Sequence, residues 1–405
     1  MIISGERSEK MNRIFFISCI ILTAVTSGLF AGGSADTSSM TQAEWEEWSG
    51  LGDFRPNVDD WDAIQEAALE EEGPLVVYSL SSRVFEFGRT FYKKYGIKVE
   101  AHDLSTPSLL EKVLREQEAG IFNADVILVD DIPTVYNEFY REGRMYGFVP
   151  TDLDSVILEE AKSAPLGIHH YGARGIAYNS EFYDEPPIDS WWDLTRPEWK
   201  GKLVMKNPLN SGAEFNTFAT FIQHHVDMEE AYQDEFGVEL IRSDGIPNAG
   251  YEFLKRLMDN DLALMSDSGT VMKAVAASGQ TDPPLGILGF SKLRTIIDEN
   301  LSAAFVEDLA PVTGFRTTTI MSIGVFSQRP NMAKLMIKWM YGGDNTADTL
   351  AGYAPYHVIG NWSVRSDIPE PDGQRPVKEM NFYIEDAEWL YDNAIKVRDF
   401  WLQNQ

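Results

Sequence analysis

The chain has 405 residues, of which 44% are hydrophobic and 24% are charged, and its formal net charge is −29 at pH 7. This excess of acidic side chains excludes an extended basic surface and therefore argues against nucleic acid as a partner. The acidic residues are dispersed except around 44–47 and 70–72, which is typical of a soluble surface rather than an acidic tail. A positively charged site inside this chain would therefore stand out.

The N-terminus has the pattern of a secretory signal. Three basic residues come first: Arg7, Lys10 and Arg13. An apolar run from Ile14 to Phe30 follows, and it ends in small residues. The run is about long enough for a transmembrane helix, but the small and polar residues after it favour cleavage. We therefore expect residues 1–33 to be removed, leaving a periplasmic protein without cysteine, since Cys19 lies inside the signal. A large core must then stabilise the fold.

A polar leader, residues 34–72, precedes a segment of alternating strands and helices. The leader contains an amphipathic pattern that predicts a helix over 59–71. A short apolar run then predicts a buried parallel strand at 75–78, and further strands are predicted at 97–101 and 124–129. Helical spacing between them predicts helices over 84–95 and 107–118. This order is a βαβαβ unit. Its ligands are expected beyond the carboxyl ends of the strands, where Ser79–Ser82 and Asp130–Asp131 fall.

A second set of alternating elements occupies the rest of the chain. The patterns predict strands at 202–205, 285–288 and 320–326 and helices over 213–225, 249–260 and 333–341. The fold class expected from the two sets is α/β, with two lobes and a cleft between them.

The order of motifs resembles the type II periplasmic-binding-protein fold of ABC-transporter extracellular solute-binding proteins, in particular the ferric-ion-binding branch. The residues that carry the resemblance are Glu72–Tyr78, Ala124–Pro133, Gly172–Asn179, Trp192–Lys202, Asn210–Ala213 and Met332–Trp339. Each motif is weak alone, but together they span about residues 62–400. The resemblance implies crossover strands between the lobes. It places 73–174 and 311–365 in lobe 1, and 175–310 and 366–405, with a C-terminal helix, in lobe 2.

The resemblance also implies an anion site. In this family, an Arg before the crossover strand and a turn at a helix start hold an anion, and these positions match Arg174 and the turn Asn210, Ser211, Gly212 and Ala213. Elementary physics agrees, because free N–H groups at a helix start favour anions and an arginine can clamp carboxylate or phosphate. The alternative is an ordinary helix cap and a salt bridge between lobes.

The family's ferric ligands are mostly missing from this chain. The position of the family's His is Ser82, Asp130 keeps the acid, and the tyrosine pair is replaced in the segment Gly289–Lys292. Fe(III) requires several anionic oxygen donors. The pattern therefore favours an organic anion, such as a phosphorylated or carboxylated metabolite, over a metal. The residues expected to bind it are Ser81, Ser82, Asp130, Arg174, Asn210, Ser211, Gly212, Ala213, Ser291 and Lys292.

No recognised catalytic motif is present, and abundant carboxylates single out no acid–base pair. The histidine pairs 169–170 and 224–225 are expected to pack rather than to chelate, because adjacent side chains point in different directions. We therefore expect no cofactor and no enzymatic activity, and a monomer whose partners are a small-molecule ligand and an ABC permease in the membrane. The alternatives are a ferric receptor with a synergistic anion and, from another class, a secreted hydrolase.

Overall fold

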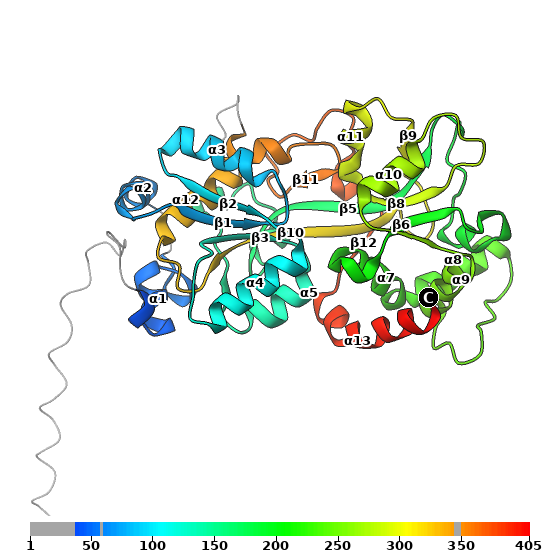
Figure 1. Ribbon diagram of the computed structural model, residues 1–405, viewed down its shortest axis with the longest axis horizontal. Coiled ribbons are helices and arrows are strands. Elements are labelled where there is room, and N and C mark those ends of the chain that lie inside the picture. The colour runs from blue at the N-terminus through cyan, green and yellow to red at the C-terminus, as the bar shows by residue number, and fades with distance from the viewer. Residues whose placement is uncertain (1–36, 57–59, 344–349) are drawn as a thin grey trace, which may run out of the picture.

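The computed structural model describes residues 37–56, 60–343 and 350–405, and its arrangement is shown in Figure 1. The expected signal segment, 1–33, lies outside the described residues. Within the described ranges, no helix is long and apolar enough to cross a membrane.

A parallel βαβαβ unit forms one end of a continuous sheet, as the sequence predicts. Its strands are β1 (Leu75–Ser79), β2 (Val99–Asp103) and β3 (Val126–Val129), and β1 pairs in parallel with both others. Helices α3 (Val84–Tyr95) and α4 (Thr106–Glu118) lie on opposite faces of these strands (Figure 1). The coverage on both faces explains why β1 and β3 are apolar and buried throughout.

A second parallel unit forms the other end of the sheet. Strand β6 pairs in parallel with both β7 and β8. The strands are β6 (Leu203–Lys206), β7 (Ala263–Met265) and β8 (Leu285–Gly289), and the helices are α7 (Gly212–Gln223), α8 (His225–Phe236), α9 (Ala249–Asp259), α10 (Ser268–Ala276) and α11 (Leu293–Asp298). The strand order across the whole sheet is β2-β1-β3-β10-β5-β8-β6-β7.

Two long antiparallel strands, β5 (Gly167–Asn179) and β10 (Gly314–Gly324), join the two ends of the sheet (Figure 1). Gly175 of β5 lies opposite Gly314 of β10. A Cβ atom on Gly314 would lie 1.9 Å from the carbonyl oxygen of Arg174, so the two backbones require glycine there. Short strands β4 (Met145–Tyr146), β9 (Ala303–Phe305), β11 (Asn361–Ser363) and β12 (Phe382–Ile384) pair with these two. The strand expected at 320–326 therefore begins earlier, at Gly314.

The described part of the leader is packed against the first unit. It contains α1 (Gln42–Ser49) and α2 (Trp61–Glu70), and α2 lies beside α12 (Pro330–Met340). Trp45 is fully buried, its indole N–H donates to the carbonyl of Ser327 at 3.0 Å, and its ring contacts Tyr146. Lys334 donates to the carbonyl of Ser49 at 2.6 Å. The leader is thus part of the folded body.

The C-terminal helix α13 (Ala387–Asn404) contacts elements from both ends of the sheet (Figure 1). Tyr391 donates to Glu138 at 3.3 Å, beside the short helix α5 (Ile132–Thr134). Farther along, Trp401 packs against Phe218 of α7 at a ring distance of 5.0 Å. The division of the chain into the two lobes expected from the sequence stays a prediction.

Candidate functional site

A pocket of about 470 Å³ opens at the carboxyl ends of β1 and β3 and beside the crossing strand β5. This volume suits a small organic molecule. The position is the one expected from the topology, because loops that follow parallel strands meet at one edge of a sheet. Six of the residues selected from the sequence line it: Ser81, Ser82, Asp130, Arg174, Ser291 and Lys292.

Of the other four selected residues, Ser211, Gly212 and Ala213 do not belong to the lining of this pocket, and the side chain of Asn210 lies outside what the structure describes. Ser211 is the N-cap of α7, and a Cβ atom on Gly212 would lie 2.9 Å from the carboxyl carbon of Asp131. The start of α7 therefore packs against the loop after β3. An anion-binding role for this turn stays a prediction.

Arg174 forms an ion pair with a carboxylate of the protein itself. Its Nη1 atom lies 2.5 Å from Oε1 of Glu214, in the first turn of α7, and the Glu214 side chain is only 3% exposed. Burial disfavours the charge of Glu214, but Arg174 and the Ser211 hydroxyl outweigh this effect and lower its pKa. Arg174 thus lines the pocket as one half of a buried ion pair rather than as a free clamp.

Three other cations gather in the pocket: Arg83, Lys292 and Arg294. None of them forms an ion pair with any residue in the described parts of the chain. Burial and the charge of Arg294 lower the pKa of both Arg83 and Lys292, which shows that the three charges repel one another. The Arg83 guanidinium also lies 5.2 Å from the centre of the Tyr356 ring. In an acidic protein, such a cluster is a local site for negative charge.

Hydroxyl groups from the second half of the chain complete the lining. Thr317 and Thr319 come from β10, Tyr356 from the short helix Ala351–Tyr356, and Asn361 from β11. Burial raises the pKa of Tyr356 to about 12, so its phenol stays protonated and can donate. Sequence reasoning missed these residues, as it missed the presence of Arg83 and Arg294 in the pocket lining. The only signal in the sequence was that Arg83 and Arg294 lie close along the chain to Ser82 and Lys292, which were selected.

A pair of buried histidines lies beside the pocket, and His170 belongs to the pocket lining. Because the register of β5 and β10 shifts at a bulge, Thr319 faces His170 while Ile320 faces Ile168, and His169 is left over. The bulge turns the two consecutive rings toward each other, with their Nδ1 atoms 2.8 Å apart. The rings therefore meet, contrary to the expectation that adjacent side chains diverge.

The hydrogen bonds of this pair fix its protons. The Met340 carbonyl can only accept, so His169 carries its proton on Nε2 and accepts at Nδ1 from His170. The bare Nε2 of His170 then accepts from Thr319 at 3.4 Å. Burial lowers the pKa of both histidines, to about 3 for His169, so both are neutral. Thr319 consequently presents an acceptor oxygen to the pocket.

Carboxyl groups crowd the end of the pocket near Arg174. Asp130, which accepts from Thr106, is followed by Asp131, and Glu385 comes from the segment after β12. Burial, together with the neighbouring aspartates, raises the pKa of Glu385 to about 8. Burial, together with Asp130, likewise raises the pKa of Asp131 to about 6. This end of the site is therefore rich in negative charge.

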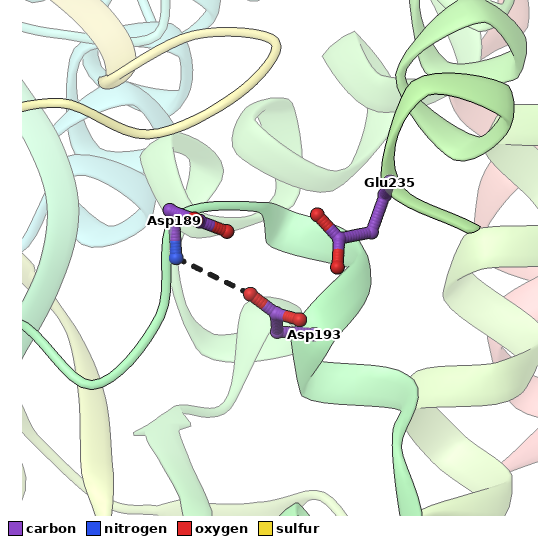
Figure 2. A group of neighbouring side chains, drawn as sticks. All are labelled: Asp189, Asp193 and Glu235. Carbon is purple, nitrogen blue, oxygen red and sulfur yellow. Dashed lines mark hydrogen bonds between the residues drawn. The ribbon is translucent and has the colours of Figure 1, made fainter. Parts of the chain in front are cut away.

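A separate acidic group, Asp189, Asp193 and Glu235, has the spacing of a metal site but not the charge balance (Figure 2). Asp193 accepts from the backbone N–H of Asp189 at 3.2 Å. Arg196 binds both Asp193, at 2.7 Å, and Glu235. The arginine already provides the positive charge that these carboxylates need, so we read the group as a structural ion-pair network.

Comparison with known proteins agrees with this architecture. Residues 144–243 match the family model of bacterial extracellular solute-binding proteins. No curated protein matches the chain in sequence. The solved structures that resemble it include iron-bound HitA from Pseudomonas aeruginosa, with 18% identity and a TM-score of 0.62 over 81% of this chain and 99% of that one. Ferric binding protein from Campylobacter jejuni has 16% identity and a TM-score of 0.60, over 82% and 99%.

A further similar structure is the periplasmic binding protein AfuA from Actinobacillus pleuropneumoniae with exogenous fructose-6-phosphate bound. It has 16% identity and a TM-score of 0.63, and the match covers 82% of this chain and 98% of that one. At these identities the likeness shows the fold alone. The type II periplasmic-binding-protein fold and the resemblance expected from the sequence are thereby confirmed.

Proposed function

We propose that this chain, which has the type II periplasmic-binding-protein fold and a segment typical of bacterial extracellular solute-binding proteins, captures a small organic anion and delivers it to an ABC importer. The ligand is a phosphorylated or carboxylated metabolite. It bridges the two lobes and shifts a pre-existing equilibrium toward a closed form that the membrane permease recognises. Capture requires no bond chemistry, and residues 1–33 direct the protein to the periplasm.

The observation that carries this proposal is the cluster of Arg83, Lys292 and Arg294. Three mutually repelling cations are costly in a half-buried pocket, and an anionic ligand offsets that cost. Hydroxyls from Ser81 and Ser82 lie at the same mouth and can complete the hydrogen bonding of an oxyanion.

A calorimetric panel tests the proposal. The purified protein is titrated with sugar phosphates, phosphonates and dicarboxylates, and with uncharged fructose as the neutral comparison. We expect at least one anion to bind and Arg83→Met to weaken it about tenfold or more, since a hydrogen bond to a charged group contributes about 1.5–3 kcal/mol.

Arg89→Met is the matched control, because Arg89 is an exposed arginine on the same helix, paired with Glu86. The affinity of the Arg89→Met protein for the anion should equal that of the wild type. An anion affinity that Arg83→Met leaves unchanged, or a panel in which no anion binds, would refute the proposal.

A ferric receptor is the second candidate, favoured by Asp130 in the pocket and by the similar iron-binding structures. The cation cluster opposes it, because Arg83, Lys292 and Arg294 would repel Fe(III) unless a synergistic anion intervened. A visible charge-transfer band on adding iron with phosphate would support this candidate, and its absence would remove it. The pocket residues add no support for a hydrolase.

A further inference from the structure

The pocket end near Arg174 carries more negative than positive charge. The interacting groups are the carboxyls of Asp130, Asp131, Glu214 and Glu385 and the cations Arg174 and Lys206. Lys206 lies 3.9 Å from Glu214, so both cations are close to this one carboxylate. Arg174 and Lys206 also act on Asp130, and Arg174 acts on Glu385, but they do not outweigh burial, which raises the pKa of both carboxyls. Partly buried carboxyl groups of this kind favour the uptake of protons or of a cation.

Unsatisfied polar atoms lie in the same cluster. Asn216 of α7 is only 4% exposed, and its side-chain hydrogen bonding lowers the pKa of both Asp131 and Glu385. The Oε2 atom of Glu214 and the Nε atom of Arg174 are buried without a hydrogen-bond partner in the described residues. Buried polar atoms without partners indicate a missing component of the site.

The cluster does not have the geometry of a metal centre. Across the described residues, the only three acidic or histidine ligands whose atoms converge within 4.8 Å are those of the Asp189 group. Two cations also stand inside the cluster, and they would oppose a divalent ion. A single positive charge with N–H donors fits better, because it neutralises one carboxylate and donates to several acceptors.

A positively charged group of a ligand in the pocket can contact the carboxyl cluster at Asp130. Asp130 and Arg174 belong both to the pocket lining and to the cluster, and Arg174 is already paired with Glu214. The acceptor oxygen of Thr319 lies in the same pocket. Arg83, Lys292 and Arg294 interact with one another, with Asp267 and Glu299 partly offsetting the effect at Lys292, whereas Asp130 interacts with Arg174, Glu214 and Lys206. The pocket therefore has two electrically distinct ends.

We infer that the captured solute is a zwitterion whose ammonium group binds at Asp130 while its anionic group binds at Arg83, Lys292 and Arg294. This inference rests on the proposed function and narrows it to amino-bearing anions. A hydroxyl group at Asp130 would satisfy hydrogen bonds but would leave the excess negative charge in place.

The test presents each anion with and without an amino group. 3-Aminopropylphosphonate is compared with 3-hydroxypropylphosphonate and propylphosphonate, and amino acids are compared with their deaminated analogues, all by calorimetry. We expect the amino compound of the best pair to bind about tenfold or more tightly than its analogue, and Asp130→Asn to abolish this preference. Glu385→Gln, which changes the cluster away from the pocket lining, should reduce the preference only in part.

Proton release gives a second readout. Because the pKa of Glu385 is raised to about 8, the cluster holds a proton at pH 7, and an arriving ammonium should expel part of it. Titration in buffers of different ionisation enthalpy should therefore detect proton release with the amino compound and none with its analogue. Equal affinities and equal proton release within every pair would overturn the zwitterion inference and leave the proposed function intact. Failure of every anion to bind would overturn both.

Discussion

Arg174 and Glu214 form a buried ion pair at the wall of the pocket, with side chains 17% and 3% exposed. Removing one partner of such a pair leaves the other charge buried without a partner, which typically lowers the free energy of unfolding by about 3–5 kcal/mol. We therefore expect Arg174→Met to lower the free energy of unfolding by about that amount. The double variant Arg174→Met/Glu214→Met should recover most of the loss, because no charge is then stranded.

Urea denaturation of the four proteins in this double-mutant cycle measures the coupling. Additive losses in the double variant would contradict the buried pair. A large coupling energy would show that Arg174 stabilises the fold through Glu214, independently of any contact with the solute.

At the residue scale, the sequence predicted the loop ends that meet at the pocket but not which side chains are free there. Ser82, Asp130 and Lys292 follow strands, and the topology alone places strand ends together. The availability of Arg83 and the engagement of Arg174 depend on where Glu214 lies, and a partner 40 residues away leaves no local pattern. Tyr356 and Asn361 are likewise brought in by long-range packing.

At the scale of elements, the fully buried Trp45 anchors the helix α1, and the hydrogen bonds of Lys334 to Ser49 and of Tyr146 to Glu46 add to this contact. The Trp45 ring contacts Tyr146 and Phe326, and its N–H donates to Ser327. Replacing a buried tryptophan with alanine typically costs about 3–5 kcal/mol. We expect Trp45→Ala to detach α1, so that limited proteolysis cuts the leader much faster than in the wild type, while solute affinity is unchanged.

Trp48→Ala is the comparison variant, because Trp48 is only partly buried on the same helix. In the Trp48→Ala protein, the protease should cut the leader almost as slowly as it does in the wild type. Equal cleavage of the Trp45→Ala and wild-type proteins would show that other contacts hold the helix.

Elements with a strong local pattern were predicted well, and elements defined by partners were not. The strands β1 and β3 and the helix α3 follow from apolar runs and helical spacing. The bounds of β5 do not follow from its sequence, because its first half, which includes His169 and His170, has no continuous apolar run and forms a strand by pairing with β10. The bulge at His169 arises from that same pairing.

For the whole molecule, partly buried carboxyls give an unusual pH dependence of stability. The pKa of Glu385 is raised to about 8 by burial and nearby aspartates, and that of Asp131 to about 6 by burial and Asp130. In the folded protein these groups keep protons that the unfolded chain loses above about pH 4–5. Their contribution to stability is therefore complete below that pH and is lost as the pH rises toward 8.

We expect the free energy of unfolding to fall between pH 5 and pH 8, by at most about 1.4 kcal/mol per pH unit for each proton involved. Urea denaturation at pH 5, 6.5 and 8 measures this slope. Glu385→Gln should flatten the part between pH 6.5 and 8. A stability that rises over this range in the wild type would disagree with the buried cluster.

The fold class and its two α/β units could be predicted from the order of motifs, because strand–helix alternation restricts the sheet to few topologies. The path of α13 could not, because a helix with apolar residues on one face can pack against any exposed apolar surface. Its observed contacts, Tyr391 with Glu138 and Trp401 with Phe218, lie at opposite ends of the sheet.

The position of α13 has a practical consequence. A helix attached to both units holds them together along one side, so any rotation about β5 and β10 must open and close the opposite side most widely. Arg89 on α3 and Ile297 on α11 are exposed residues of the two units, and neither belongs to the pocket lining. Cysteines placed at these two positions and labelled with a donor and an acceptor dye would convert the proposed solute capture into a change in fluorescence, which makes the chain a scaffold for an optical biosensor.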